Sequence, residues 1–187
     1  MTTPTAPAPQ ASADVGQFTE TSLAVLRLLG EGHTVDKAAR ILGIRHAQAS
    51  NVLSEAYKRT FGAPLGKGYA SVRTQFLKLL DYAYSSGALT PTPVTAVDLG
   101  DLPREILRLV VDGRTAQEIA ELLDRGEAEV RAGTRRLRVA AGMDPNESWN
   151  RIVNWGHGSG NLTASAGVSA DTAAAASRPT SGTEGPR

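Results

Sequence analysis

Apolar residues recur every three or four positions in two blocks of the chain, a spacing that predicts amphipathic helices rather than strands. The first block predicts helices that begin near residues 19, 34 and 46, and a fourth helix over 70–85. The second block predicts the same order, with its third helix over about 127–141 and a shorter fourth helix around residues 149–155. Two prolines in the segment 85–101 disfavour a helix between the blocks. The pattern therefore predicts an all-α fold.

Local signals place the helix starts and turns. Thr19 or Thr21 suits the start of the first helix, and Thr34 and Thr115 suit the starts of the second helix of each block, because a threonine hydroxyl accepts from a free amide of the first turn. Gly43 suits a turn that requires positive φ. Apolar residues between these signals supply the expected core, with Trp149 and Trp155 as packing residues.

The second block repeats the first. Residues 25–61 return without a gap as residues 106–142, which lie 81 positions later. Identical pairs are Leu26/Leu107, Arg27/Arg108, Leu28/Leu109, Gly32/Gly113, Thr34/Thr115, Ala39/Ala120, Leu42/Leu123 and Ala47/Ala128. An internal repeat of this kind predicts two copies of one small helical unit.

The first copy resembles the LuxR/GerE-type helix-turn-helix. The resemblance is carried by VLRLLGEGHTVDKAARILGI, by AQASNVLSEAYKRTFG and by the trailing RTQFLKLLDYAYSSGAL. It implies two tandem four-helix LuxR-like domains of a bacterial regulator, the second divergent, over residues 18–90 and 102–157 and joined by a linker over 91–101. The fourth helix is a common dimerisation element of this family, so the resemblance makes four residues of the first fourth helix candidates for an interdomain contact or for an intersubunit contact in a homodimer: Phe76, Leu79, Leu80 and Tyr84.

Composition predicts disorder at both ends of the chain. Residues 1–17 are rich in Thr, Ala and Pro, and residues 158–187 are rich in Gly, Ser, Ala and Thr with almost no large apolar residue. Such segments bury too little surface to offset the entropy of ordering. We therefore expect a disordered leader and a disordered tail.

The third helix of the first copy carries the candidate DNA-reading residues. A helix-turn-helix presents its second helix to the major groove, where Asn and Gln bind adenine edges. The outward residues include Gln48, Ser50, Asn51 and Ser54, and the resemblance assigns base reading to the last three. Arg45, Lys58 and Arg59 are expected at phosphates. Residues 45–78 hold six Lys or Arg and one Glu, although the whole chain has a net charge of only +1.

The second copy departs from this pattern. Arg125 and Gly126 replace the apolar turn residue and the polar cap, and Glu127 and Glu129 open the helix where phosphates would repel them. Gly133 in mid-helix costs roughly 1 kcal/mol relative to Ala. In the opposite direction, three arginines are DNA-contact candidates, since Arg is the commonest reader of guanine: Arg131, Arg135 and Arg136.

Other function classes find little support. The chain has no Cys, its three His lack ligand spacing, and no nucleophile or nucleotide-binding motif occurs in a suitable setting, so neither an enzyme, a metal nor a cofactor is expected. The start of the chain lacks a secretory pattern, and no apolar run approaches the length of a membrane span. We expect a cytoplasmic, nucleoid-associated protein.

These observations favour a sequence-specific transcriptional regulator that binds double-stranded DNA with the third helix of the first copy. The alternative is a protein-interaction module that reuses the helix-turn-helix to bind RNA polymerase or another regulator, since a fold does not fix a function. The near-neutral charge and the Glu127/Glu129 pair favour this alternative.

Overall fold

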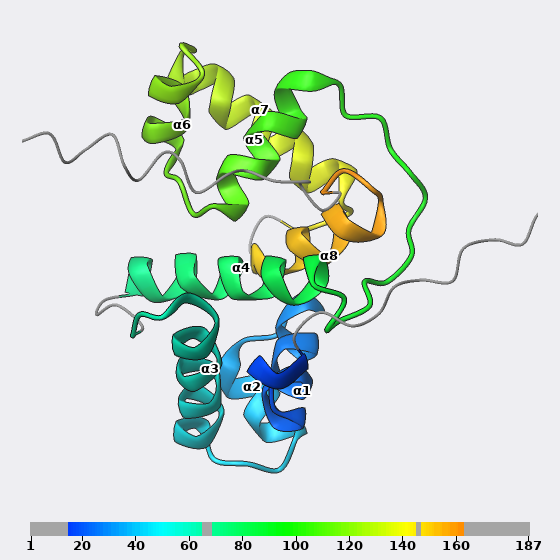
Figure 1. Ribbon diagram of the computed structural model, residues 1–187. Helices are drawn as coiled ribbons and strands as arrows, with labels where there is room; N and C mark the ends of the chain where they lie inside the picture. Colours follow the sequence, from blue (N-terminus) through cyan, green and yellow to red (C-terminus); the bar gives the residue numbers. More distant parts are fainter. Residues whose placement is uncertain (1–14, 65–68, 145–146, 163–187) are drawn as a thin grey trace, which may run out of the picture.

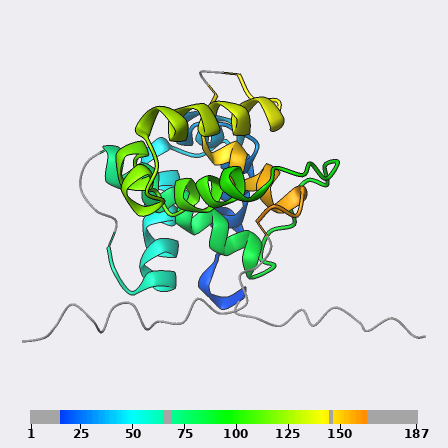
Figure 2. The same ribbon diagram turned by 90° about the horizontal axis from the view of Figure 1, so that it is seen from above.

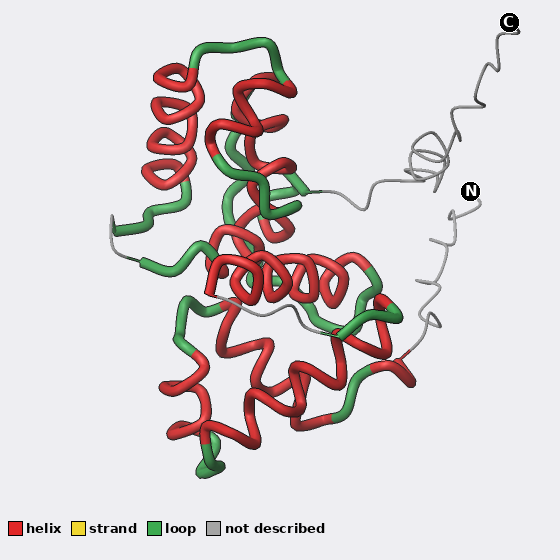
Figure 3. Tube along the Cα trace, turned by 90° about the vertical axis from the view of Figure 1, so that its left-hand side faces the viewer, coloured by secondary structure: helices red, strands yellow, loops and turns green. Residues whose placement is uncertain are grey.

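The computed structural model describes residues 15–64, 69–144 and 147–162, and all regular structure within them is helical, as predicted (Figures 1 and 3). A short 3-10 turn, η1, covers Val15–Gln17. The α-helices are α1 (Glu20–Gly30), α2 (Val35–Ile41), α3 (His46–Phe61), α4 (Tyr69–Ser85), α5 (Asp101–Val111), α6 (Ala116–Leu122), α7 (Glu127–Ala140) and α8 (Asn150–Gly158).

The predicted cap residues begin the helices. Thr19 caps α1, and its hydroxyl accepts from the Ser22 amide at 3.1 Å while the Ser22 hydroxyl accepts from the Thr19 amide at 2.9 Å. Thr34 caps α2 by accepting from the Lys37 amide at 3.2 Å. Thr115 caps α6 in a reciprocal pair with Glu118. These side chains satisfy first-turn amides that have no partner inside the helix.

The first three helices of each block form a compact unit, and the backbone of the second unit repeats that of the first. After α2, the Ile44 amide donates to the Ala39 carbonyl at 3.0 Å; after α6, the equivalent Arg125 amide donates to the Ala120 carbonyl at 2.9 Å. Equivalent bonds also close the turns after α1 and α5. The repeat seen in the sequence is therefore a repeat of local backbone structure.

The turn conformation is kept by a different residue in each copy. Gly43 has φ +65°, as predicted for this position, and the residue 81 positions later, Asp124, has φ +50°. Asp is one of the few non-glycine residues that tolerate this region. Gly133, by contrast, has a packing role, because a Cβ at this position would lie 2.5 Å from Cδ1 of Ile106, and the Ile106 side chain would have to shift.

The two fourth helices join the units. α4 lies between the α1–α3 unit and the α5–α7 unit, and α8 packs along it (Figure 1). α8 also packs against α1 of the first unit, and α4 packs against α5 of the second, so each fourth helix contacts the first helix of the opposite unit. Of the candidate contacts, Leu79, Leu80 and Tyr84 are buried and Phe76 is half-buried. The Tyr84 ring lies 5.3 Å from the His157 ring of α8, so this candidate makes an interdomain contact.

The segment between the units is pinned to α8. The Thr92 backbone amide donates to the Asn154 carboxamide oxygen at 2.9 Å, and the side-chain nitrogen of Asn161 donates to the Val97 carbonyl at 3.0 Å. A Cβ at Gly158 would collide with the Thr92 carbonyl, so this approach requires glycine. Figure 2 shows the linker returning beside α8 and the residues that follow it.

The two expected disordered segments lie mostly outside the described residues. Their described parts are ordered against the core. The leader was expected to reach residue 17, but η1 already packs against α3. The tail was expected from residue 158, but Ser159, Asn161 and Leu162 are buried. Both boundaries therefore lie further toward the ends of the chain than composition indicates.

Candidate nucleic-acid interface

α3 has one buried face and one free face. Ala49, Leu53, Ala56 and Tyr57 are buried against α1 and α2, which leaves the opposite side of α3 exposed. The turn through Gly43 fixes the angle at which α3 leaves α2. Arg45, at the capping position before α3, forms no side-chain cap, and the first turn of the helix carries no acidic residue. Its first turn therefore presents unopposed backbone amides and a positive helix end to solvent.

The predicted DNA-reading residues do not all share the centre of this face. Gln48 and Asn51 are exposed, whereas Ser50 and Ser54 are half-buried. The Ser50 hydroxyl lies 3.3 Å from Nε2 of His46, one turn earlier on the same helix. Of the four polar candidates, the two carboxamides are the ones fully available to a partner.

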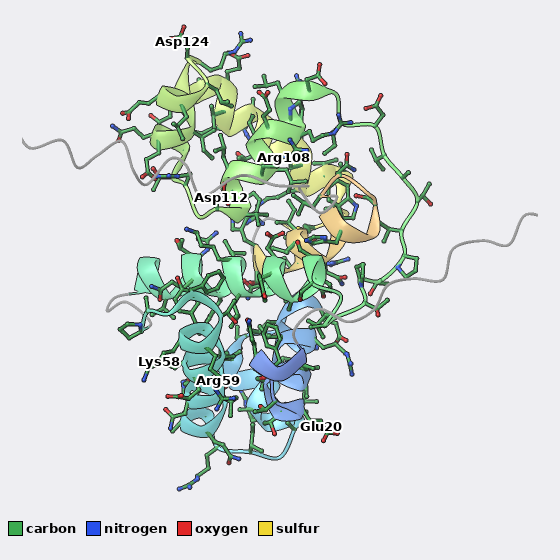
Figure 4. The ribbon with its side chains drawn as sticks, viewed as in Figure 1. Glu20, Lys58, Arg59, Arg108, Asp112 and Asp124 are labelled. Carbon is green, nitrogen blue, oxygen red and sulfur yellow. The ribbon has the colours of Figure 1, made fainter. Side chains whose placement is uncertain are left out.

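The predicted phosphate-binding residues are exposed and free of ion pairs. Arg45, Lys58 and Arg59 are exposed, and none forms an ion pair with a described carboxylate. Lys58 extends from the outer side of α3 in Figure 4. Cations without local counterions keep their full field for an anionic partner. Glu55 is the acidic residue on the same helix.

A shallow cavity beside α3 was not anticipated from the sequence. Asn51, Glu55 and Arg59 line it together with Gln17 and Thr19, so the start of the described chain lies next to the candidate reading face. Its volume is about 160 Å³. The contact follows from packing of η1 on α3, and no periodic signal in residues 15–17 indicates it.

α7, the equivalent helix of the second unit, has a different surface. Arg131 forms an ion pair with Glu127 at 2.6 Å, and Arg125 lies 3.9 Å from Glu129. Both glutamates stand in the first turn, as expected. Two of the cations near the start of α7 are therefore neutralised within the chain.

The remaining arginines of α7 divide between solvent and structure. Arg135 and Arg136 are exposed, and Arg135 Nε lies 3.4 Å from the Arg131 carbonyl. Arg138 instead lies over the Trp149 ring, 4.2 Å from its centroid, and donates to the Asp144 carbonyl at 2.9 Å. Burial lowers the pKa of the Arg138 guanidinium, and the charge of Arg73 lowers it further. Arg138 thus anchors Trp149 and is not a free surface cation.

An apolar residue also stands on the free face of α7. Val139 is 79% exposed and occupies the position equivalent to Lys58 of α3. The Val139 side chain is therefore not used in the core of the chain, and it is an apolar group on a helix of charged residues. The free faces of α3 and α7 therefore offer different chemistry, polar and cationic on α3 and mixed acidic, basic and apolar on α7.

Two further searches of the described residues bear on other kinds of site. They contain no group of three or more His, Cys, Asp or Glu placed to hold a metal ion. No helix among them is long and apolar enough to cross a membrane.

Comparison with known proteins adds no relative. No model of a known protein family matches the chain, and neither the curated proteins nor the solved structures include a significant match.

Proposed function

We propose that the chain is a sequence-specific, double-stranded-DNA-binding transcriptional regulator of the LuxR/GerE helix-turn-helix type, with α3 as its recognition helix. The observation that carries the proposal is the free face of α3, where exposed Gln48 and Asn51 are flanked by three cations that form no ion pair with a described carboxylate: Arg45, Lys58 and Arg59. Carboxamides bind adenine edges in a two-pronged manner, and cations bind the phosphates on either side. Such a protein would act in the cytoplasm, on the nucleoid.

In this proposal the second unit has a lesser role in DNA binding than the first. Glu127 and Glu129 would approach phosphates if the start of α7 entered a groove, which opposes docking. Arg135 and Arg136 lie further along α7 and are the cations left for phosphates, while Arg131 is held by Glu127. We therefore assign base reading to α3, and to α7 at most backbone contacts.

The pairing of α4 with α8 supports a monomeric binding unit. A LuxR-like regulator is expected to dimerise through its fourth helices, and here two equivalent fourth helices already pack within one chain. Leu79 and Leu80 are fully buried within the chain and have no surface left for a second chain. We propose that one chain supplies both units of the pair.

The test is selection of binding sites from random duplex DNA with the full chain, followed by affinity measurements on the selected and a scrambled duplex. Asn51→Ala is expected to weaken binding to the selected duplex by roughly 5- to 100-fold, the range of one good side-chain pair to a base, and to leave the scrambled duplex unchanged. Gln117→Ala, which removes an exposed carboxamide from α6, is the control. Equal losses on both duplexes would remove Asn51 as a base reader.

A second candidate function is a protein-interaction module that binds RNA polymerase or another regulator. The observation that favours it is the free face of α7, which carries an acidic first turn at one end and 79%-exposed Val139 at the other. Absence of any mobility shift at micromolar protein and moderate salt, on genomic fragments and selected DNA alike, would favour this module over the DNA-binding regulator.

A further inference from the structure

A cavity of about 300 Å³ lies between α4 and the second unit. α4 contributes Arg73, Thr74 and Leu77, and the opposite wall comes from α5, α6, α7 and the residues between them. The lining residues on that side are Val110, Gly113, Arg114, Thr115, Ala116, Ile119, Thr134 and Trp149. The two units meet closely at one edge of the cavity, where the Thr74 hydroxyl lies 3.4 Å from the Gly113 carbonyl.

The walls of the cavity are largely apolar. Leu77, Val110 and Ile119 are buried core residues whose side chains reach the cavity, and Ala116 and the half-buried Trp149 extend the apolar surface. Binding sites for small molecules combine such walls with a few placed polar groups. A volume of this size accommodates a flat organic molecule of roughly ten to fifteen heavy atoms.

Positive charge is concentrated around these walls. Arg73 on α4 forms no ion pair with a described residue, and Arg114 on the opposite side lies 3.6 Å from Glu118. The Glu118 carboxylate is already engaged, since it accepts from the Thr115 amide at 2.7 Å. Arg138 adds a third guanidinium behind the Trp149 ring. An anionic group placed between Arg73 and Arg114 would relieve the repulsion among these cations.

The hydroxyl groups of the cavity complement this charge. Thr134 donates to the Arg131 carbonyl at 2.9 Å, and Thr74 donates to the Gly113 carbonyl. With their protons used in this way, both hydroxyl oxygens retain only the capacity to accept. The cavity thus combines cationic donors at its rim with acceptors on its walls.

We propose that this cavity binds a small aromatic acid, that is, a flat apolar body with an N–H or O–H donor and one carboxylate or phosphate group. The anionic group would lie between Arg73 and Arg114, the ring against Trp149 and Leu77, and the donor would face Thr74 or Thr134. Because α4 forms one wall and the second unit the other, the ligand would tie the two units together. This proposal does not depend on DNA binding.

The experiment uses the two tryptophans as reporters. The chain has only Trp149, which lines the cavity, and Trp155, which is buried elsewhere in α8, so its NMR spectrum has two indole N–H signals. Trp149→Phe assigns them. The probes are indole-3-acetate and indol-3-yl phosphate, which share the indole N–H and differ in the anionic group, and the uncharged control is indole-3-acetamide. For at least one of the two acids we expect a saturable shift of the Trp149 signal with a dissociation constant of about a millimolar or below, and a far smaller shift of Trp155.

Three charge variants test the assignment. Arg73→Gln and Arg114→Gln are each expected to weaken binding of that acid roughly tenfold, because each removes a charge-assisted hydrogen bond. Arg108→Gln, which removes an exposed arginine of α5 that does not line the cavity, should leave binding unchanged. Comparison of the two acids decides between carboxylate and phosphate.

Other results would overturn the proposal. No saturable shift of Trp149 with either acid up to about 10 mM is one, and equal binding of the uncharged amide is another. Equal effects of Arg108→Gln and the two cavity variants would show that the net charge of the chain, rather than the cavity, attracts the acids. None of these readouts requires DNA, so the proposal can fail while the DNA-binding function stands.

Discussion

α3 and α7 occupy the same place in two repeated units, but the surfaces that they expose differ in chemistry. Their turns share backbone hydrogen bonds and a residue with positive φ, Gly43 in one and Asp124 in the other. On the free face, Lys58 of α3 is replaced by Val139 in α7, and the first turn gains Glu127 and Glu129. Core and turn positions are held by packing and hydrogen bonding, while the free face can change without cost to the fold. Function therefore has to be argued for each unit separately.

The fourth helices differ from the first three of each unit, because they make contacts across the two units. α4 and α8 pack on each other and on the first helix of the opposite unit. Each unit thus completes its core with a helix from the other repeat. This arrangement predicts that two units with different surfaces still unfold as one body.

The largest effect is expected from truncating one equivalent core residue in each unit. Leu26 of α1 and Leu107 of α5 are both fully buried, so Leu26→Ala and Leu107→Ala should each lower the free energy of unfolding by about 2–5 kcal/mol. Both tryptophans follow the second unit, so fluorescence reports there, whereas circular dichroism reports on all helices. We expect both signals to fall together in urea for both variants, because α8 packs on α1.

Separate transitions would contradict this expectation. If Leu26→Ala lowers the first part of the circular-dichroism transition and leaves the tryptophan transition unchanged, then the α4–α8 contact does not couple the units. The two tandem domains expected from the sequence would then be independent in stability.

The next effect sets two cations of α3 against two of α7. At about 0.1 M salt, Lys58→Gln with Arg59→Gln should weaken binding to any duplex by roughly tens of fold and reduce the slope of log K against log salt by about 1.8. Arg135→Gln with Arg136→Gln removes the same charge from the second unit and should weaken binding less than about threefold. A fluorescence anisotropy titration over a range of salt concentrations measures both quantities.

Equal losses in the two double variants would show that α7 lies as close to DNA as α3. The division of roles between the units would then be wrong, although DNA binding itself would stand. No loss in either variant would show that DNA binds through neither of these two faces, and α3 would then not be the recognition helix.

The helices were predictable from the sequence because their signals are local. Thr34 and Thr115 cap helices through amides three residues away, and the positive φ at Gly43 is indicated by the glycine itself. The resemblance assigned base reading to Ser50, Asn51 and Ser54, of which Asn51 is exposed and the two serines are half-buried.

Features that depend on distant partners were not predictable in this way. No local pattern indicates that Arg138 covers Trp149 or that α8 reaches α1. Gly133 was expected only as a helix-weakening residue, but its position against Ile106 makes it a packing residue. Asp124 was missed because an aspartate with positive φ carries no signal apart from its alignment with Gly43.

A titration effect of intermediate size is expected at the junction between the units. Burial raises the pKa of Tyr84 to about 12, and the nearby Glu31 charge adds to the increase. A phenol with a raised pKa stabilises the fold fully below pH 10, and this contribution is lost as pH rises from 10 to about 12. It amounts to at most about 3 kcal/mol.

Tyr84→Phe has no such proton to lose. Its unfolding free energy should fall less than that of the parent between pH 9 and 11.5 in urea titrations, whatever its value at pH 9. Identical decreases in the two proteins would show that the phenol ionises as freely in the fold as in the unfolded chain.

The smallest effect concerns the turn that both units share. At φ +65°, Gly43→Ala should cost about 1 kcal/mol, since a Cβ is disfavoured there, and Gly43→Asp should cost about half as much, because Asp tolerates this region better than Ala. Asp124→Gly should change stability by less than about 0.5 kcal/mol, because relief of the backbone is offset by the greater freedom of glycine in the unfolded chain. Urea unfolding of the three variants gives these values. A cost for Gly43→Asp equal to that for Gly43→Ala would mean that Asp124 is tolerated through its own surroundings, and that the two turns are not interchangeable.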